Sequence, residues 1–509
     1  MLKKIEHLAK VIIILFGIGA MVWIIGTSIF SPNLGNILSG FRSESTLNKV
    51  IIQNLIASII AIIVIGCTLY ISKVEINFKT TNLIAIIEAV LFFIFLLWLF
   101  HFLDIQTPID DSSFVLNIAE EVEETGKISG WYLAANPQNL FILFVYIIID
   151  KLFGSFDHYT IYKIFAIMHA LSALLIYFSA KKLTNKPIAS LLSMNLFMFT
   201  IQITLHLINI YTDTLSIFTS LIMVFFFIYF IQTKDLNKKI LYLTLSSIFL
   251  SISFFAKGLF LILFIAVAIV LIVGLSGKEK WLVLIPILTF LLLNTGWTKG
   301  IDALNLYEIE ERGMPNTHYL FMGANAENYF QDDGNEIYRS AGGYNDNDLA
   351  FSKKLFWDQR MSKSEISRIH LDLIKERWSS LSPTEALAFL NAKNATTWSS
   401  GDLKSTFSIK LAAEHNNISS KLATSRFFNL YMQTIQMIYY FILLFVFIKL
   451  FIKGDGNLYI LLTCLFLVGM FLFLLFWEAS PRYAMTIMSF APILFPYLVP
   501  DKNVLSKIK

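Results

Sequence analysis

Long apolar runs separated by short polar segments dominate the chain. A helix that crosses a bilayer needs roughly 20 mostly apolar residues, because about 30 Å of hydrocarbon is crossed at 1.5 Å per residue. The pattern therefore predicts an all-α polytopic membrane protein with a bundle of about 12 transmembrane helices. The twelve runs are 11–30, 49–72, 82–103, 159–181, 188–208, 211–231, 240–257, 258–275, 281–298, 428–452, 457–477 and 483–499.

A thirteenth run, 140–149, is too short to span. Its ten residues, LFILFVYIII, end at Asp150 and Lys151. This length is typical of an interfacial or re-entrant helix. The first run, 11–30, lacks a small-residue cleavage site and is followed by eleven more, so we do not expect it to be a cleaved signal peptide.

Composition agrees with membrane residence and excludes several other classes. Of the 509 residues, 56% are apolar and 15% are charged, against about 25% charged in ordinary soluble domains, and the mean hydropathy is +0.66. These values exclude a soluble enzyme and a disordered tail. A net charge of +4 is too small for a nucleic-acid-binding protein. Cys67 and Cys464 lie inside apolar runs, which argues against a disulfide framework or a cysteine metal site.

The distribution of Lys and Arg predicts the orientation, because short cytoplasmic loops carry an excess of both. With a cytoplasmic N-terminus and no span at 140–149, the cytoplasmic segments hold 18 basic residues; if that run spanned, 13 of them would move outside. We therefore expect both termini inside. The expected divisions are an N-terminal transmembrane hairpin (1–81), a transmembrane core (82–298) with a first outer loop (104–158), an extracytoplasmic helical loop domain (299–427) and C-terminal transmembrane helices (428–509).

The first outer loop carries two adjacent carboxylates, Asp110 and Asp111, soon after the third span. Adjacent acids repel each other, so one has a raised pKa or the pair has a cation nearby. A general base or a divalent-metal ligand uses such an arrangement. Alternatively, Asp111 caps a helix that starts near Ser112, a role that does not need Asp110.

Trp131, Tyr132, Asn136 and Pro137 come later in the same loop. Taken alone, they suit an interfacial anchor, because aromatic rings favour the headgroup level and Pro137 ends or starts a helix.

The order of these features resembles the GT-C glycosyltransferases, polytopic enzymes that use polyprenyl-phosphate sugars and include the protein O-mannosyltransferases and lipid A aminoarabinose transferases. The shared layout covers roughly 82–300: a span, an outer loop with an acid pair, a Tyr and a Pro-x-Asn element, a short amphipathic run and many further spans. The resemblance implies a GT-C-like bundle with juxtamembrane helices and a large extracytoplasmic loop domain. It also implies a catalytic base at Asp110 or Asp111, and leaves open which, since two extra spans precede the usual first one.

Further outer-face residues fit this resemblance. Tyr211-Thr212-Asp213 resembles an element of low-GC Gram-positive members in which a second acid faces the active site, which leaves room for a divalent metal (Mg or Mn) at Asp110 and Asp213. The alternative is a tight turn in which Asp213 caps the next helix. Lys163 and Lys257 lie at outer span ends, where the resemblance implies binding of a lipid phosphate. Alternatively, Lys163 snorkels to headgroups and Lys257 is an ordinary loop residue.

Two later segments complete the predicted site. Pro315-Asn-Thr-His318, followed by Gly323 and by Gly342-Gly343-Tyr344, is similar to the Gram-positive branch, with His318 at the acceptor site or simply on the surface. Glu478-Ala-Ser-Pro-Arg482-Tyr483 resembles the Glu-x-x-x-Arg-Tyr element of many members. An Arg fork binds two phosphate oxygens at once, and a local Glu478–Arg482 pair is the alternative or an addition. The resemblance thus assigns substrate-binding roles to Tyr132, Asn136, Lys163, Lys257, His318, Glu478, Arg482 and Tyr483.

Nucleotide sugars are cytoplasmic, so an outer-face active site needs a donor already carried across the bilayer. We expect transfer of a sugar from a polyprenyl-phosphate donor to a hydroxyl of a cell-envelope glycan, glycolipid or protein, with inversion at the anomeric carbon. A flippase or transporter of lipid-linked saccharides is the alternative. Such a protein predicts acidic residues in mid-span, yet the spans are nearly free of Asp and Glu, and Glu88 in the third span is a notable exception. A non-catalytic membrane scaffold is the third possibility.

Overall fold

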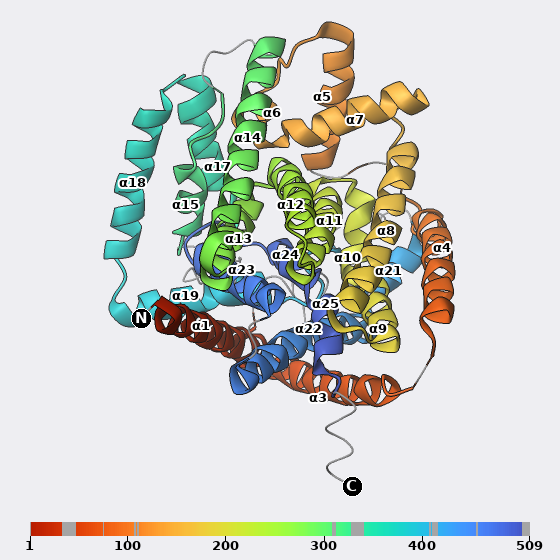
Figure 1. The fold of residues 1–509 in the computed structure, drawn as a ribbon. Helices are drawn as coiled ribbons and strands as arrows, with labels where there is room; N and C mark the ends of the chain where they lie inside the picture. The colour runs from red at the N-terminus through yellow and green to blue at the C-terminus, as the bar shows by residue number, and fades with distance from the viewer. Residues whose placement is uncertain are drawn as a thin grey trace.

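A computed structural model describes residues 2–32, 47–74, 76–105, 108, 111–307, 312–326, 341–406, 409, 416–454 and 457–500. Within these ranges the regular structure is helical (Figure 1), and strand-like pairing is limited to two isolated bridges, Ile128–Tyr307 and Gly343–Ala479. The predicted all-α fold is confirmed for the described part of the chain.

Eight helices among the described residues are long and apolar enough to cross a membrane. Each coincides with one of the predicted runs. They are α1 (Leu2–Phe30), α3 (Leu47–Ile71), α4 (Phe78–Phe102), α8 (His158–Thr184), α11 (Thr212–Gln232), α12 (Leu236–Ala256), α14 (Leu284–Leu304, continuing the 3-10 turn η4, Gly277–Val283) and α22 (Arg426–Lys453).

The other four predicted runs are helical but short or broken, so the count by length is eight, or nine with one bent pair, and not twelve. Run 188–208 bends by 48° between α9 (Pro187–Met198) and the segment formed by α10 (Ile201–Leu205) and η2 (His206–Asn209). The last run, 483–499, is divided into short pieces: Pro492 lies in the first turn of α25 (Ala491–Leu498), a position that tolerates proline, and Pro496 lies inside α25. The remaining pieces are η3 (Gly258–Phe260), α13 (Leu261–Gly274), α23 (Leu458–Leu474), η6 (Pro481–Tyr483), α24 (Ala484–Met488) and α25 (Ala491–Leu498).

The first outer loop folds into short helices. They are α5 (Asp111–Thr125), α6 (Trp131–Ala135), η1 (Pro137–Asn139) and α7 (Leu140–Phe153). The apolar run 140–149 lies in α7, which crosses above the upright helices α8, α11 and α12 in Figure 1. Gly154 ends α7 with a left-handed φ of 70°, a conformation that favours glycine.

The segment between α14 and α22 is also helical. Capping boxes, Ser362 with Glu365 and Ser382 with Glu385, start its two longest helices, because each Ser and Glu pair satisfies free amides of the first turn. Its helices are α15 (Thr317–Gly323), α17 (Asp346–Lys353), the π-turn η5 (Lys354–Asp358), α18 (Lys363–Ser379), α19 (Pro383–Trp398) and α21 (Asn417–Thr424).

The N-terminal helices are part of the main core. α1 packs on α22 and α23 and also contacts α19, and α3 packs on α22 (Figure 1). Their buried residues belong to the same apolar cluster as α8, α11 and α13, while a second cluster joins α4, α5 and α7 to α8. Helices α1 and α3 are therefore integrated into the bundle.

Candidate functional site

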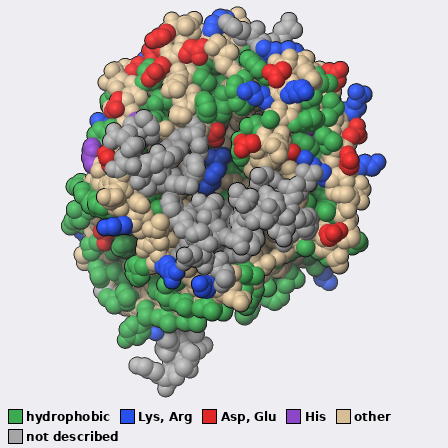
Figure 2. Space-filling model, turned by 180° about the vertical axis from the view of Figure 1, so that it is seen from behind, with side chains coloured by type: hydrophobic (Ala, Val, Ile, Leu, Met, Phe, Trp, Pro, Cys, Tyr) green, Lys and Arg blue, Asp and Glu red, His purple; other side chains and the backbone are tan. Residues whose placement is uncertain are grey.

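Five charged side chains from four distant places in the sequence lie near one another. Asp111 begins α5, Asp213 lies in the first turn of α11, and Lys257 follows α12. Glu478 and Arg482 lie in the turn between α23 and α24. The Arg482 charge acts on those of Asp111, Asp213 and Lys257, and the Glu478 charge interacts with those of Arg482 and Asp111. Figure 2 shows a hollow in one face of the molecule where Lys or Arg side chains lie near an Asp or Glu side chain.

Asp213 and Lys257 form a largely buried ion pair. Their side chains are 8% and 12% exposed. Ile210 adopts a left-handed φ of 44° before α11, and Tyr211 then occupies the N-cap position without a side-chain cap bond. Asp213 is thus not the helix cap, and that interpretation is wrong. Its carboxylate instead accepts a hydrogen bond from Lys257, which ends α12.

Asp111 and Arg482 form a looser and more open pair. The nearest oxygen and nitrogen are 3.8 Å apart, and the side chains are 37% and 29% exposed. Helix α5 begins at Asp111, so this residue is the first of the helix and not a cap before Ser112. Asp110, the other predicted base and metal ligand, lies outside the described residues.

Arg482 interacts with both described aspartates. The charges of Asp213 and Asp111 act on its guanidinium, whose carbon lies 5.9 Å from the centre of the Tyr483 ring. The Lys257 ammonium lies 5.2 Å from the centre of the same ring. Both cations therefore lie near the Tyr483 ring, and the charges of Glu478 and Asp213 also act on Tyr483.

Glu478 is half-buried, and burial raises the pKa of its carboxyl group, whereas Arg482 and Lys404 oppose this rise. Among the described residues no direct ion pair joins Glu478 to Arg482, and Arg482 pairs with Asp111. The predicted local Glu478–Arg482 pair is therefore not found, although the two charges still interact.

Two buried tyrosines extend the site beneath Asp111. The hydroxyl oxygens of Tyr132 and Tyr211 are 3.4 Å apart, and Asn139 donates a hydrogen bond of 3.0 Å to the Tyr132 hydroxyl. Burial raises the pKa of the Tyr132 phenol well above the ordinary value, so this group stays neutral. Tyr132 is buried within the site and does not act as an anchor at the surface.

Asn136 connects the first outer loop to the loop domain. Its side-chain oxygen accepts hydrogen bonds from the Tyr319 hydroxyl at 3.2 Å and from Gln138 at 3.1 Å. The Tyr319 ring stacks on Trp477, with ring centres 5.1 Å apart. Because Trp477 precedes Glu478, this contact ties α15 to the turn that carries Arg482.

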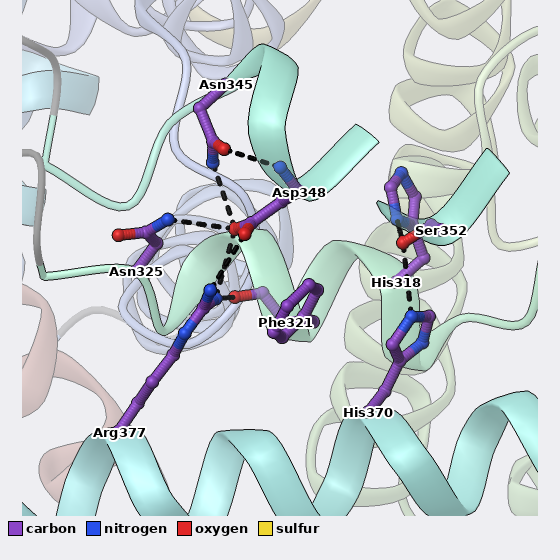
Figure 3. A network of polar contacts seen from close by, with 8 residues as sticks. All are labelled: His318, Phe321, Asn325, Asn345, Asp348, Ser352, His370 and Arg377. Carbon is purple, nitrogen blue, oxygen red and sulfur yellow. Dashed lines mark hydrogen bonds and ion pairs between the residues drawn. The ribbon is translucent and has the colours of Figure 1, made fainter. Parts of the chain in front are cut away.

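Two predicted residues lie apart from this cluster. The Lys163 ammonium lies 4.9 Å from the centre of the Tyr159 ring, and no described ion pair joins it to the five charges. His318 is buried inside the loop domain, where its Nδ1 is 2.8 Å from the Ser352 hydroxyl (Figure 3). The surface interpretation of His318 is wrong, and its surroundings are those of an internal network.

The described residues do not form a metal site that fits the predicted one. Of its two ligands only Asp213 is described, and its carboxylate is paired with Lys257. No group of three or more His, Cys, Asp or Glu side chains in the described ranges could hold a metal ion.

Sequence reasoning missed three neighbours of the site. His206, a turn before Tyr211, bonds the Leu403 carbonyl through Nε2 at 2.8 Å and senses the charges of Asp213, Lys257 and Arg482. Tyr319 and Lys393 come from the loop domain. A signal existed only for Tyr319, which directly follows His318 in the motif already singled out.

No family model matches the chain, and no curated protein matches it. A functional conclusion therefore depends on the residues and their arrangement. Arg482 and Lys257 can bind an anionic oxygen, because charge-assisted hydrogen bonds to phosphate are strong. Asp111, whose side chain is 37% exposed, can accept a proton.

Proposed function

We propose that the protein is a membrane glycosyltransferase of the GT-C type that uses a polyprenyl-phosphate sugar on the extracytoplasmic face. The observation that carries the proposal is the convergence of Asp111, Asp213, Lys257 and Arg482 in one charged cluster of an apolar helical protein. The proposal includes twelve spans, with the four short or bent runs counted as crossings, and both termini in the cytoplasm.

In the proposed reaction, an acceptor hydroxyl attacks the anomeric carbon of the sugar while Asp111, or Asp110 beside it, takes the hydroxyl proton. A new bond forms between the acceptor oxygen and the anomeric carbon, and the bond from that carbon to the phosphate oxygen breaks. Its electron pair leaves with the polyprenyl phosphate. Direct displacement inverts the anomeric centre.

Arg482 and Lys257 stabilise the departing phosphate. The 3.8 Å separation of Arg482 from Asp111 is long for a hydrogen-bonded pair, which supports a readily exchanged contact. When a phosphate binds, Arg482 turns to it and Asp111 is released for the acceptor. Asp213 keeps Lys257 charged in its buried position. Removal of one such charge stabiliser costs about 10²–10³ in rate.

The acceptor class is a hydroxyl compound of the cell envelope, either glycan, glycolipid or protein. Tyr319 and Asn136 link the loop domain to the site and supply hydrogen-bonding groups near the turn that holds Arg482. Their position supports an acceptor that approaches between the first outer loop and the loop domain.

The test is transfer by purified protein in vesicles that contain a panel of polyprenyl-phosphate hexoses and N-acetylhexosamines. We expect Asp111→Asn or Asp110→Asn to lower the transfer rate by about 10²–10⁴, the usual effect of losing a general base. The matched control is Glu124→Gln, an exposed acid of α5, which retains the rate. Wild-type rates in both aspartate variants contradict the assignment. Movement of the lipid-linked sugar across the bilayer without transfer favours the flippase instead.

A further inference from the structure

Lys393 is a fully buried lysine of α19 whose role the proposed reaction leaves unexplained. Its ammonium donates hydrogen bonds to the backbone carbonyls of Gly323 and Trp477, the latter at 2.9 Å. Both hydrogen-bond partners are neutral. Burying a cation is costly unless it is well paired and hydrogen-bonded, so this position holds a lysine at the expense of stability.

Three backbone segments meet at Lys393, and glycines allow their approach. A Cβ added at Gly323 would lie 2.3 Å from the carbonyl oxygen of Phe476. At Gly342, which has a left-handed φ of 58°, a Cβ would lie 2.9 Å from the Lys393 side chain. The Ala479 amide donates a 2.8 Å hydrogen bond to the Gly342 carbonyl. The glycines noted in the sequence thus form a junction around Lys393.

This junction leads directly to the charged site. Trp477, held by Lys393, precedes Glu478, and the same turn reaches Arg482 four residues later. Stacking of Trp477 on Tyr319 fixes the other side of the turn. The Lys393 charge also acts on Glu478. Burial lowers the pKa of Lys393 to about 7, whereas Glu478 acts in the opposite direction.

We propose that Lys393 is a positioning residue: by holding the Trp477 carbonyl it fixes the turn 477–482, so that Arg482 faces Asp111 and Asp213. Lys393 is buried and does not touch the substrate, so it acts through Arg482. The part that concerns phosphate binding rests on the proposed function, whereas the part that concerns the turn does not.

The first measurement needs no ligand. Hydrogen–deuterium exchange of a peptide covering 475–483 is compared between wild type, Lys393→Met and the milder Lys393→Gln. We expect at least tenfold faster exchange at the Ala479 amide in both variants, because the hydrogen bonds of a charged group are worth about 1.5–3 kcal/mol, or a tenfold change per 1.4 kcal/mol. Lys375→Met, an exposed lysine of α18, is the matched control and leaves exchange unchanged.

The second measurement uses farnesyl phosphate as the probe, with binding followed by calorimetry in detergent. We expect Lys393→Met to weaken binding about tenfold. In a double-mutant cycle, Lys393→Met adds little to the loss already caused by Arg482→Gln, since coupled residues are not additive. A merely structural lysine gives additive losses instead.

The possible outcomes test the positioning role of Lys393 separately from the proposed function. Wild-type exchange in both Lys393 variants overturns the positioning role, as do additive binding losses. If wild type does not bind farnesyl phosphate, the proposed function and the ligand part of this inference fail, and the exchange data still decide whether Lys393 fixes the turn. Where Lys393→Met does not fold, Lys393→Gln and Gly342→Ala, which crowds the same junction, provide the comparison.

Discussion

At the scale of single residues, the Asp213–Lys257 pair shows how the protein keeps charge in an apolar setting. Both side chains are largely buried, and each is the direct ionic partner of the other. Breaking a buried pair by removing one partner is strongly destabilising, because the remaining charge has no compensation. The pair therefore supports the fold as well as the proposed chemistry.

We expect Asp213→Asn to lower the free energy of unfolding by about 3–5 kcal/mol, since the Lys257 charge then stays buried and uncompensated. The double variant Asp213→Asn/Lys257→Met loses less, because no buried charge is left. Thermal unfolding in detergent, compared with wild type and Lys257→Met, checks this. A double variant less stable than Asp213→Asn contradicts it.

The charged residues at span ends could be recognised from the sequence as candidates for the site, but which of them pair with each other could not be predicted. Asp213, Lys257 and Arg482 could be singled out because charged groups near the bilayer are costly and rarely accidental. The partners depend on how four remote segments pack, so the caps predicted for Asp111 and Asp213 and the local Glu478–Arg482 pair were wrong. Lys393 gave no signal, because one lysine in a polar helix looks like any surface lysine.

At the scale of elements, a buried polar network ties three helices of the loop domain together (Figure 3). His318 on α15 and His370 on α18 share the Ser352 hydroxyl of α17, at 2.8 and 3.1 Å. Beside them, Arg377 of α18 makes hydrogen bonds of 2.7 and 3.0 Å to both carboxylate oxygens of Asp348. The α15 helix that carries Tyr319 is thereby held in place.

This network predicts acid sensitivity of the loop domain. Burial lowers the pKa of His318 and of His370 from 6.5 to about 4. Between these two pKa values the unfolded chain binds more protons than the folded one. The contribution of each histidine to the free energy of unfolding is therefore complete above pH 6.5 and is lost as the pH falls toward 4. The full loss is on the order of 3 kcal/mol for each histidine.

This expectation is tested by measuring the unfolding temperature in detergent between pH 7.5 and pH 5, a range that includes the ordinary histidine pKa of about 6.5. We expect the unfolding temperature to fall as the pH is lowered. His318→Gln or His370→Gln is expected to reduce the dependence on pH. His7→Gln, an exposed histidine of α1, is the control and leaves it unchanged. An undiminished pH dependence in both buried-histidine variants contradicts the role of the network.

The apolar runs predicted where helices form better than they predicted whether each helix is continuous. Every predicted run is helical within the described residues, including 140–149 in α7. The bend after α9 and the short pieces η6, α24 and α25 are local breaks in the helix, which a count of apolar residues does not weigh. The arrangement of the loop domain was out of reach, because its contacts join residues far apart in the chain.

At the scale of the whole molecule, the proposed topology can be tested through accessibility. In a variant with Cys67→Ala and Cys464→Ala, single cysteines replace Glu124 of α5 and Lys238 of α12, both exposed. We expect a membrane-impermeant maleimide to label Glu124→Cys in intact cells, and Lys238→Cys only after permeabilisation. Labelling of Lys238→Cys in intact cells overturns the orientation; if Glu124→Cys is labelled as well, 140–149 spans.

The seam between α1 and α19 has a consequence for how the protein is made. Trp23 donates to the Asn391 side chain at 3.0 Å across 368 residues of sequence, and Ser28 donates to the Trp398 carbonyl at 3.1 Å. At 5–20 residues per second, translation separates such partners by roughly 20–70 s. Asn54 of α3 meets the Ser28 carbonyl long before this, whereas the Trp23 and Ser28 side chains wait for α19, so the α1–α19 seam is among the last contacts of α1 to form during synthesis.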